Sequence, residues 1–299
     1  MLQFSEYFYN PKLVLLSLLN KTCRLWPDRF FLKKKFYLTI GKRLDLSNPK
    51  SFNEKLQWLK LNDRKREYVR MVDKCDVKDI VSEKIGIEYI IPTIAVYNKI
   101  SDIDFDALPN QFVLKCTHDS GGVVVCRDKV ALDIAKVKNK LSECLKRNYY
   151  WETREMPYKE VRPRIIAENY MEDSSGELRD YKFMCFNGEV KCSFVVSNRF
   201  GEGSLCVDFY DKNWTLMPFT RHYPNSKDGV ACPKSYNKMI ELAEKLAKGI
   251  TFVRIDFYEV DEKPYFGEIT FYPGGGFEEF NPENWDTIFG SWIKLPNIN

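Results

Sequence analysis

Three charged residues near the end of the chain, Arg254, Asp256 and Glu268, have the types and spacing that could bind a cation or a phosphate. They stand in VRIDFYEVDEKPYFGEITFYPGGG, which reads as two apolar strands joined by a turn at Asp261–Pro264. Side chains alternate along a strand, so Arg254 and Asp256 share a face, and the return strand brings Glu268 close to Asp256. Carboxylates within an apolar sheet usually have a partner or a metal. A metal or phosphate site and a solvated sheet edge are equal alternatives here.

A second candidate is FVLKCTHDSGGVVVC, in which Lys115 ends an apolar strand and a loop with Ser120, Gly121 and Gly122 follows. Glycines let backbone N–H groups approach a phosphate closely, and the lysine neutralises its charge. The segment is neither a Walker loop nor a dinucleotide fingerprint, because the glycines lead into a strand. An ordinary hairpin is the alternative. His118 in this loop either contacts a phosphate or an acyl intermediate, or bonds to the backbone.

The third candidate is IIAENYMEDSSGELRDYKFMCFNGEV, where an apolar strand enters Glu168-Asn169-Tyr170-Met171. The Asn169 carbonyl and the Met171 amide could bond the edge of an adenine. Asp180 and Lys182 alternate onto one face of the next strand, where they could bind ribose hydroxyls and phosphates. The alternative is a solvated ion pair, which is common and weak.

The elements that must position these residues fall into three regions. The first part is mainly helical, with helices expected at Pro11–Asn20 and Phe30–Ile40 and after a capping-box pattern at Ser51 and Glu54. From Pro92 the chain becomes rich in strands and predicts α+β lobes with antiparallel sheets. We therefore expect a helical N-terminal region, a lobe with the phosphate loop and a C-terminal lobe with the metal site, at residues 1–90, 91–168 and 169–299.

Composition restricts the class of function. The chain has 299 residues, of which 44% are hydrophobic, enough for a substantial core. Its 46 basic and 42 acidic residues leave a net charge of +4 that is dispersed, so nucleic acid is not an expected partner. Nine cysteines include no C-x-x-C pair and there are only two histidines, so we expect reduced thiols in the core and no zinc cluster.

The longest apolar run, Leu13–Leu19, is too short to span a membrane and predicts a helix packed on the body of the protein. The basic run Lys33–Lys35 predicts a solvated helix surface. The N-terminus does not read as a secretory signal. We expect a cytoplasmic protein without a membrane span, and association with membrane-bound glycan machinery stays open.

In this order, the segments resemble an ATP-grasp protein. More narrowly, the chain resembles the TupA-like ATP-grasp family of bacterial surface-polysaccharide loci. The resemblance covers nearly the whole chain and rests on NPKSFNEKLQWLKLNDR, VDKCDVKD, FVLKCTHDSGG, E-N-Y-M, D-Y-K, R-I-D and EITFYPGGG. It implies an α+β ATP-grasp fold, in which two α+β lobes grip ATP after a mainly helical N-terminal region.

The resemblance also implies which residues hold ATP and magnesium. Asp256 and Glu268 would hold Mg²⁺, and Thr270 stands where family members commonly have Asn as a further, stronger ligand. The lysines would bind the phosphates, the glycine loop would fold over them, and the hinge segment would hold the adenosine. This cofactor-binding set comprises Lys115, Ser120, Gly121, Gly122, Glu168, Asn169, Met171, Asp180 and Lys182.

The activity implied is an ATP-dependent carboxylate-amine ligase that works through an acyl phosphate. Arg254 would grip the carboxylate or acyl phosphate, with Lys182 and His118 as further catalytic residues. The substrate would be a cell-surface or capsular polysaccharide, or its precursor, that receives an amino acid or amino sugar. Candidate acceptor-pocket residues, with a plain surface cluster as the alternative, are Arg199, Arg221 and His222. A sugar kinase and a non-catalytic nucleotide- or glycan-binding subunit remain alternatives, and the oligomeric state is not predicted.

Overall fold

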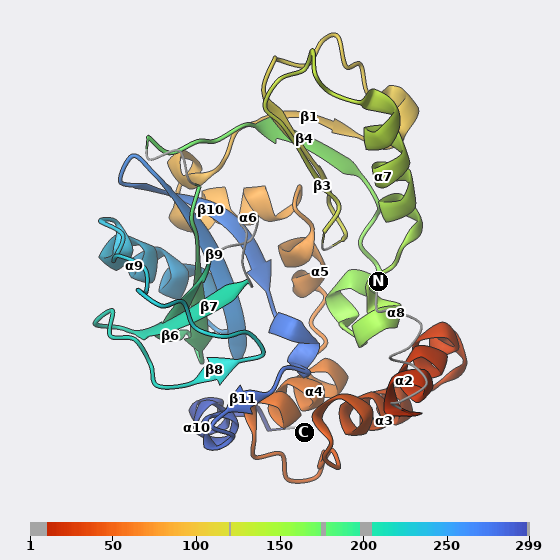
Figure 1. The fold of residues 1–299 in the computed structure, drawn as a ribbon, viewed down its shortest axis with the longest axis vertical. Coiled ribbons are helices and arrows are strands. Elements are labelled where there is room, and N and C mark those ends of the chain that lie inside the picture. The colour runs from red at the N-terminus through yellow and green to blue at the C-terminus, as the bar shows by residue number, and fades with distance from the viewer. Residues whose placement is uncertain (1–10, 120, 175–177, 198–204, 298–299) are drawn as a thin grey trace.

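The computed structural model has two sheet-containing lobes above a layer of helices (Figure 1). It describes residues 11–119, 121–174, 178–197 and 205–297. The upper lobe in this view carries a four-stranded sheet and the lower lobe a five-stranded sheet. The N-terminal helices lie beneath and between them, so they connect the two lobes.

Five α-helices make up the first part of the described chain. Their bounds are α2 Pro11–Lys21, α3 Asp28–Ile40, α4 Phe52–Asn62, α5 Glu67–Val72 and α6 Val77–Ile85. The capping box predicted for α4 is confirmed, since the Glu54 amide donates to Ser51 Oγ and the Ser51 amide donates to the Glu54 carboxylate. This reciprocal cap satisfies two backbone donors at the start of the helix.

The apolar run Leu13–Leu19 lies in helix α2, which packs against α3 as expected, but three side chains of the run are exposed. Only Leu19 is buried in this helix, whereas Val14, Leu15 and Leu18 are exposed. An apolar pattern marks a helix but does not show that each of its faces has a partner. No helix among the described residues is long and apolar enough to cross a membrane.

The upper sheet is antiparallel with the strand order β1-β4-β2-β3. Helix α7 (Ile134–Lys146) begins at Asp133, whose side chain accepts from the Lys136 amide, and covers this lobe (Figure 1). The strands are β1 Thr93–Tyr97, β2 Phe112–Cys116, β3 Val123–Cys126 and β4 Ile165–Asn169. The lobe has its own hydrophobic core, which lies between the sheet and α7. The chain leaves it through the short helix α8 (Tyr150–Thr153) before β4.

The lower sheet is also antiparallel, with the order β10-β9-β5-β6-β7. The predicted Asn187-Gly188 turn joins β5 to β6, and both of its residues have positive φ. The strands are β5 Asp180–Phe186, β6 Glu189–Ser197, β7 Cys206–Asp211, β9 Phe252–Val260 and β10 Lys263–Thr270. Helix α9 (Tyr236–Ala247) packs on this sheet, and a two-stranded pair, β8 (Thr220–Arg221) with β11 (Phe280–Asn281), precedes α10 (Asn284–Trp292).

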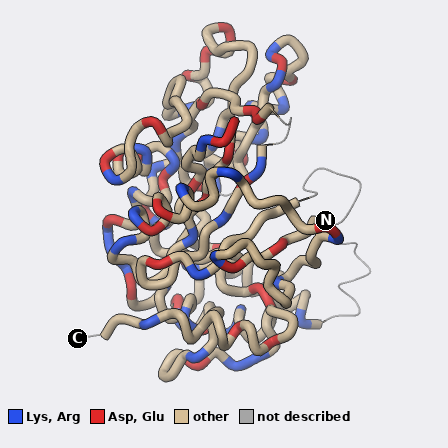
Figure 2. Tube along the Cα trace, turned by 90° about the vertical axis from the view of Figure 1, so that its left-hand side faces the viewer, with Lys and Arg blue, Asp and Glu red and all other residues tan. Residues whose placement is uncertain are grey.

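The N-terminal helices and the lower sheet share one hydrophobic core. The nine cysteines are thiols and six of them are buried, as the sequence predicts. Basic and acidic residues are interspersed on the face shown in Figure 2, without a stripe of one sign. The two sheets therefore belong to different lobes, and the N-terminal helices pack with the lower sheet.

Candidate active site

The closing hairpin brings its charged residues into direct contact. Pairing of β9 with β10 sets Glu268 opposite Asp256 and Thr270 opposite Arg254. Arg254 donates from Nε to Asp256 Oδ1 at 2.7 Å, and from Nη2 to Asp256 Oδ2 at 2.7 Å and to Glu268 Oε1 at 2.6 Å. The cation between the two carboxylates is therefore this guanidinium. Asp256 is 1% exposed, so a solvated sheet edge is excluded at that residue.

Strand β5 adds a lysine to the same cluster. Lys182 lies opposite Asp256 across the β5–β9 pair, and its Nζ is 2.5 Å from Asp256 Oδ2 and 2.6 Å from Asp180 Oδ2. The side chains of Lys182 and Asp180 are 8% and 14% exposed, so this ion pair is largely shielded from solvent. We name Asp180, Lys182, Arg254, Asp256 and Glu268 the sheet cluster.

The two carboxylates that contact Arg254, those of Asp256 and Glu268, have pKa values shifted in opposite directions. Burial raises the pKa of Asp256 to about 6, with Asp180 and Glu268 contributing in the same direction against Arg254 and Lys182. For Glu268 burial also acts upward, but Arg254, Lys74 and Lys182 outweigh it and lower the pKa to about 2. The Glu268 side chain keeps 39% of its surface exposed, so the cluster opens to a ligand on that side.

A second carboxylate-lysine group lies in the upper lobe. Glu168 on β4 contacts Lys115 of β2 at 2.7 Å and Lys78 of α6 at 2.5 Å. Burial raises the pKa of Glu168, but the two ammonium groups outweigh it and the pKa lies below its usual range. We name these three residues the lid cluster. Lys78 was missed by the sequence analysis, because its contact with Glu168 joins residues that are far apart in the sequence.

Tyr258 lies on the same face of the sheet as the sheet cluster. It lies opposite Asp180 in the β5–β9 pair, and alternation from Arg254 and Asp256 puts it on their face of β9. Burial, followed by carboxylates of both clusters including Glu168, holds the pKa of Tyr258 well above its usual range. The sequence analysis did not single out this residue, although the same period of two would have found it.

The glycine loop after β2 is fixed at its base. Gly121 has φ +96, a conformation that favours glycine, and a Cβ at Gly122 would lie 3.0 Å from the Cβ of Cys116. The Asp119 carbonyl accepts from Lys74 Nζ at 2.9 Å, and its carboxylate lies 2.5 Å from an Arg147 nitrogen. Ser120, predicted at the tip, lies outside the described residues.

His118 is 2% exposed, and its Nε2 lies 3.2 Å from the Cys144 carbonyl. Burial lowers the pKa of this imidazole. The structure therefore shows the backbone-bonded arrangement, and His118 is not among the residues that contact the sheet cluster. Its predicted catalytic role has no support from these contacts.

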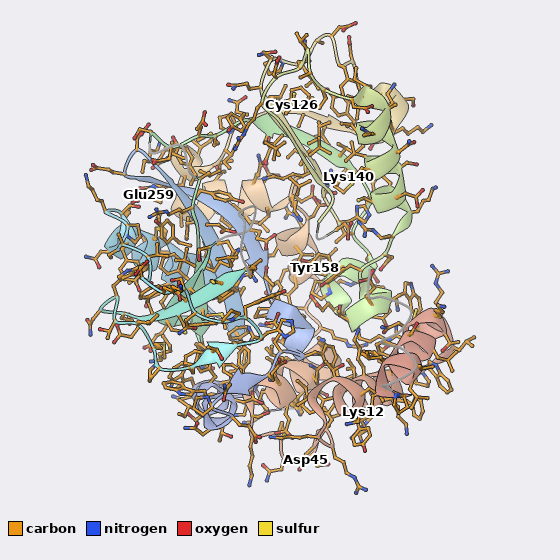
Figure 3. All side chains as sticks on the ribbon, in the orientation of Figure 1. Lys12, Asp45, Cys126, Lys140, Tyr158 and Glu259 are labelled. Carbon is orange, nitrogen blue, oxygen red and sulfur yellow. The ribbon has the colours of Figure 1, made fainter. Side chains whose placement is uncertain are left out.

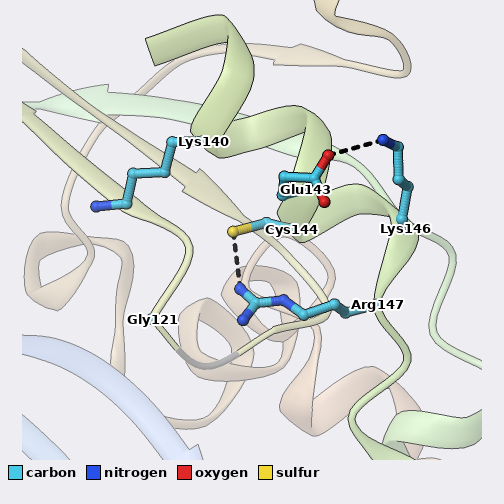
Figure 4. Close-up of a pocket in the computed structure, with 6 residues that line it drawn as sticks. All are labelled: Gly121, Lys140, Glu143, Cys144, Lys146 and Arg147. Atoms are coloured by element: carbon cyan, nitrogen blue, oxygen red, sulfur yellow. Dashed lines mark hydrogen bonds and ion pairs between the residues drawn. The ribbon is translucent and has the colours of Figure 1, made fainter. Parts of the chain in front are cut away.

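A cavity of about 520 Å³ lies beside the glycine loop (Figure 4). Its described lining contains three basic residues and one acidic residue, with Arg147 Nη2 at 2.9 Å from Cys144 Sγ and Lys146 Nζ at 2.7 Å from Glu143. The lining residues are Gly121, Lys140, Glu143, Cys144, Lys146 and Arg147. None of them belongs to the sheet cluster or the lid cluster, so this cavity is separate from both.

The hinge residues lie where the chain passes between the lobes. Asn169 ends β4, and its amide donates to the Pro92 carbonyl at 3.1 Å. Met171 follows outside any strand and before β5. Their predicted contacts with adenine remain a prediction.

The two described acceptor candidates, Arg221 and His222, differ in burial. Arg221 is 3% exposed, donates from Nη2 to the Pro273 carbonyl at 3.0 Å and lies over the ring of Phe52. His222 is exposed and pairs with Glu279 at 3.3 Å. Arg199 lies outside the described residues. Arg221 thus supports the glycine turn from within the core.

That turn is held by a buried lysine, Lys60, which the sequence analysis did not single out. Gly274, Gly275 and Gly276 have φ between +60 and +66, and Lys60 Nζ donates to the Gly275 carbonyl at 2.6 Å and to the Thr153 carbonyl at 2.8 Å. Burial lowers the pKa of Lys60 to about 7. Burial, followed by the charges of Glu155 and Glu268, raises the pKa of Tyr158, in the middle of the molecule (Figure 3), well above its usual range. Hydrogen bonds from Lys60 and Arg221 therefore hold the turn that follows β10.

Comparison with known proteins gives one family match. The sequence profile described as TupA-like ATPgrasp matches residues 54–294. No protein of curated function matches the chain.

Several solved structures are similar in part. A D-alanine–D-alanine ligase from Bacillus anthracis has 16% identity and a TM-score of 0.37, with 67% of this chain and 57% of that chain covered. The corresponding enzyme from Helicobacter pylori has 14% identity and a TM-score of 0.45, over 83% and 68%. An L-amino acid ligase from Bacillus licheniformis has 13% identity and a TM-score of 0.41, over 69% and 42%. The chain spans less than two thirds of the first and third of these proteins.

Proposed function

Because the chain belongs to the TupA-like ATP-grasp family, we propose that it is an ATP-dependent ligase that joins a carboxylate to an amine through an acyl phosphate. The observation that carries the proposal is the register of β5, β9 and β10, which gathers two cations and three carboxylates on one sheet face. The acceptor we propose is a bacterial surface glycan or its precursor, modified with an amino acid or amino sugar. This part rests on the family resemblance.

The lid cluster suits phosphate. Two ammonium groups, of Lys115 and Lys78, face a single carboxylate, so the group keeps a positive excess for an anion. The glycine loop next to Lys115 offers backbone N–H groups to the same ligand. Adenosine would then lie against the hinge at Asn169 and Met171.

Magnesium fits the donor set of the sheet cluster. It takes hard oxygen ligands and commonly uses one or two carboxylates together with substrate phosphates. Asp256 and Glu268 would hold the ion, with Thr270 as a weaker donor, and the ion would neutralise phosphate charge during transfer. Among the described residues no group of three or more His, Cys, Asp or Glu side chains is arranged to hold a metal ion.

The residues of the chain then have separate tasks. Lys182 holds Asp256 and Asp180 in place and offers its charge to the phosphates. Arg254 donates to Asp256 and Glu268 in this structure; with Mg²⁺ on those carboxylates its guanidinium would turn to the substrate carboxylate and stabilise the oxyanion formed when the amine attacks. No nucleophile from the protein is needed, because ATP activates the carboxylate.

A non-catalytic nucleotide-binding subunit is a second candidate, and one observation favours it. Arg254 already bridges Asp256 and Glu268, so a guanidinium takes the position of the cation between the two carboxylates. A protein of this kind would bind ATP without turning it over.

The test is ADP release by the intact protein with ATP, Mg²⁺ and mixtures of amino acids and uronic acids. A ligase releases ADP and phosphate only when carboxylate and amine are both present. Labelled γ-phosphate that stays on a sugar would identify a kinase, and ATP binding without turnover in any mixture would identify the non-catalytic subunit. The variant for this assay is Asp256→Asn, which removes a proposed magnesium ligand. Its control is Asp79→Asn, which alters an exposed carboxylate on α6.

A further inference from the structure

The first two helices expose an unusual amount of apolar surface. Half of the large hydrophobic side chains that are exposed on the described residues fall between residues 14 and 37. They include Val14, Leu15, Leu18, Leu25, Trp26 and Phe30. We name α2, α3 and their connection the N-terminal hairpin. It lies at the edge of the molecule, away from both sheets (Figure 1).

The exposed apolar side chains of α2 form one face. Val14, Leu15 and Leu18 stand at positions i, i+1 and i+4, and the last two are 53% and 57% exposed. Leu19, four residues after Leu15, borders this face and is buried in the core. A contiguous apolar face on a folded protein marks a place where something binds.

The charge of the hairpin indicates what binds there. Residues 11–40 contain seven Lys or Arg and one acidic residue, Asp28, whereas the whole chain is nearly balanced with 46 and 42. Asp28 is engaged with Arg64 at 2.8 Å, with Arg154 at 3.2 Å and with the Tyr150 hydroxyl at 2.6 Å. The surface is therefore apolar and strongly basic together.

We propose that the N-terminal hairpin docks the protein on the surface of an anionic lipid bilayer. A helix with an apolar face flanked by basic residues lies in the interfacial plane, with its apolar side chains in the acyl boundary and its cations at anionic headgroups. Helix α2 has 11 residues, which suits lying on a bilayer and not crossing it.

Aromatic and basic side chains also lie close together on the exposed part of the hairpin. The rings of Trp26 and Phe30 stack at 4.8 Å, and Lys34 Nζ lies 5.5 Å from the Phe30 ring. Lys12 Nζ lies 5.9 Å from the Tyr37 ring and joins the two helices; Figure 3 shows Lys12 on this side of the molecule. Such amphipathic rings favour the headgroup level of a bilayer. A second copy of the chain fits less well, because two equally basic faces repel each other.

The test is co-sedimentation of the full chain with phosphatidylcholine vesicles, with and without phosphatidylglycerol. We expect binding only when phosphatidylglycerol is present, and weaker binding as salt is raised. Leu15→Glu with Leu18→Glu should lower the affinity for these vesicles at least about tenfold, since it places two charges in the face that would enter the bilayer. The matched control is Ile87→Glu with Val130→Glu, two exposed apolar residues in other regions, which should bind as the unaltered protein does.

A charge-reversal pair separates the electrostatic part. Lys21→Glu with Lys33→Glu should weaken binding to the anionic vesicles, whereas Lys227→Glu with Lys248→Glu, also exposed, should not. Loss of the vesicle-induced shift in tryptophan fluorescence in Trp26→Phe would locate the contact.

The proposal is overturned if the intact protein ignores anionic vesicles, or if control and hairpin variants bind equally. It is also overturned if the protein is a dimer that Leu15→Glu with Leu18→Glu dissociates, since a second copy would then cover the face. Vesicle binding is measured without ATP, so its result is independent of the ligase proposal.

Discussion

Two buried carboxylates, Glu168 of the lid cluster and Asp256 of the sheet cluster, have similar surroundings and opposite electrostatics. Each is 5% exposed or less and each is contacted by two cationic side chains. Yet the pKa of Glu168 is lowered, whereas that of Asp256 is raised to about 6. Contact with cations alone therefore does not decide whether the pKa of a buried carboxyl group is raised or lowered.

The difference lies in the other carboxylates. Glu168 is alone with two lysines, so the lid cluster has a positive excess. Asp256 shares Lys182 and Arg254 with Asp180 and Glu268, so three carboxylates compete for two cations. The first arrangement suits a phosphate and the second suits an additional cation.

The largest effect should come from removing the lone carboxylate. Glu168→Gln leaves the ammonium groups of Lys115 and Lys78 largely buried without a counter-charge, and we expect unfolding free energy to fall by about 3–5 kcal/mol. Urea unfolding of the unliganded protein measures it.

A surface copy of the same arrangement is the control for that variant. Glu241 lies between Lys238 and Lys245 and is half-exposed, so Glu241→Gln should leave the urea midpoint nearly unchanged. Equal losses in the two variants would refute the claim that burial makes the lid cluster special.

The sheet cluster should respond in activity more than in stability. Asp256→Asn relieves the competition among three carboxylates but removes a proposed magnesium ligand. We expect Mg²⁺-dependent ADP release to fall at least about a hundredfold, or ~2.7 kcal/mol. The free energy of unfolding in urea should fall less than in Glu168→Gln. A larger loss of stability than of activity in Asp256→Asn would contradict the claim that the sheet cluster serves activity more than stability.

Local patterns in the sequence predicted the parts of this site that lie on single strands or hairpins. Alternation placed Arg254 with Asp256, and the hairpin turn placed Glu268 beside them. The arginine was assigned to substrate, because nothing in the sequence shows that its guanidinium reaches both carboxylates.

Contacts between distant segments could not be predicted in this way. Lys78 reaches Glu168 from another element, and Lys60 reaches Gly275 across more than two hundred residues. The exposed face of α2 is a related case: the apolar residues of Leu13–Leu19 predicted a helix correctly, but periodicity does not reveal which face is left without a partner.

The two carboxylates should also give opposite slopes of stability with pH. The folded-state pKa of Glu168 is lowered, so its stabilisation is complete above its unfolded pKa, about 4.3, and is lost as the pH falls below that value. The folded-state pKa of Asp256 is raised to about 6, so charging it opposes folding, and stability falls as the pH rises from its unfolded value toward 6. The free energy of unfolding, measured with urea at each pH, should depend less on pH below about 4.3 in Glu168→Gln than in the unaltered protein. In Asp256→Asn it should depend less on pH between the unfolded pKa of Asp256 and about 6. Identical pH profiles in the two variants would contradict the assignment.

The smallest expected effect concerns Thr270, the third proposed magnesium donor beside the sheet cluster. Thr270 lies opposite Arg254, and its hydroxyl donates to Glu268 Oε1 at 3.2 Å, so its proton is committed to a carboxylate that would also face the metal. An asparagine carbonyl offers a stronger oxygen ligand without a proton. Thr270→Asn should therefore lower the Mg²⁺ concentration needed for ATP binding by a few-fold, less than ~1.4 kcal/mol, in calorimetric titrations. Thr270→Ser keeps the hydroxyl and should leave the titration unchanged. Weaker Mg²⁺ dependence in both variants would mean that residue 270 supports Glu268 and does not ligate the ion.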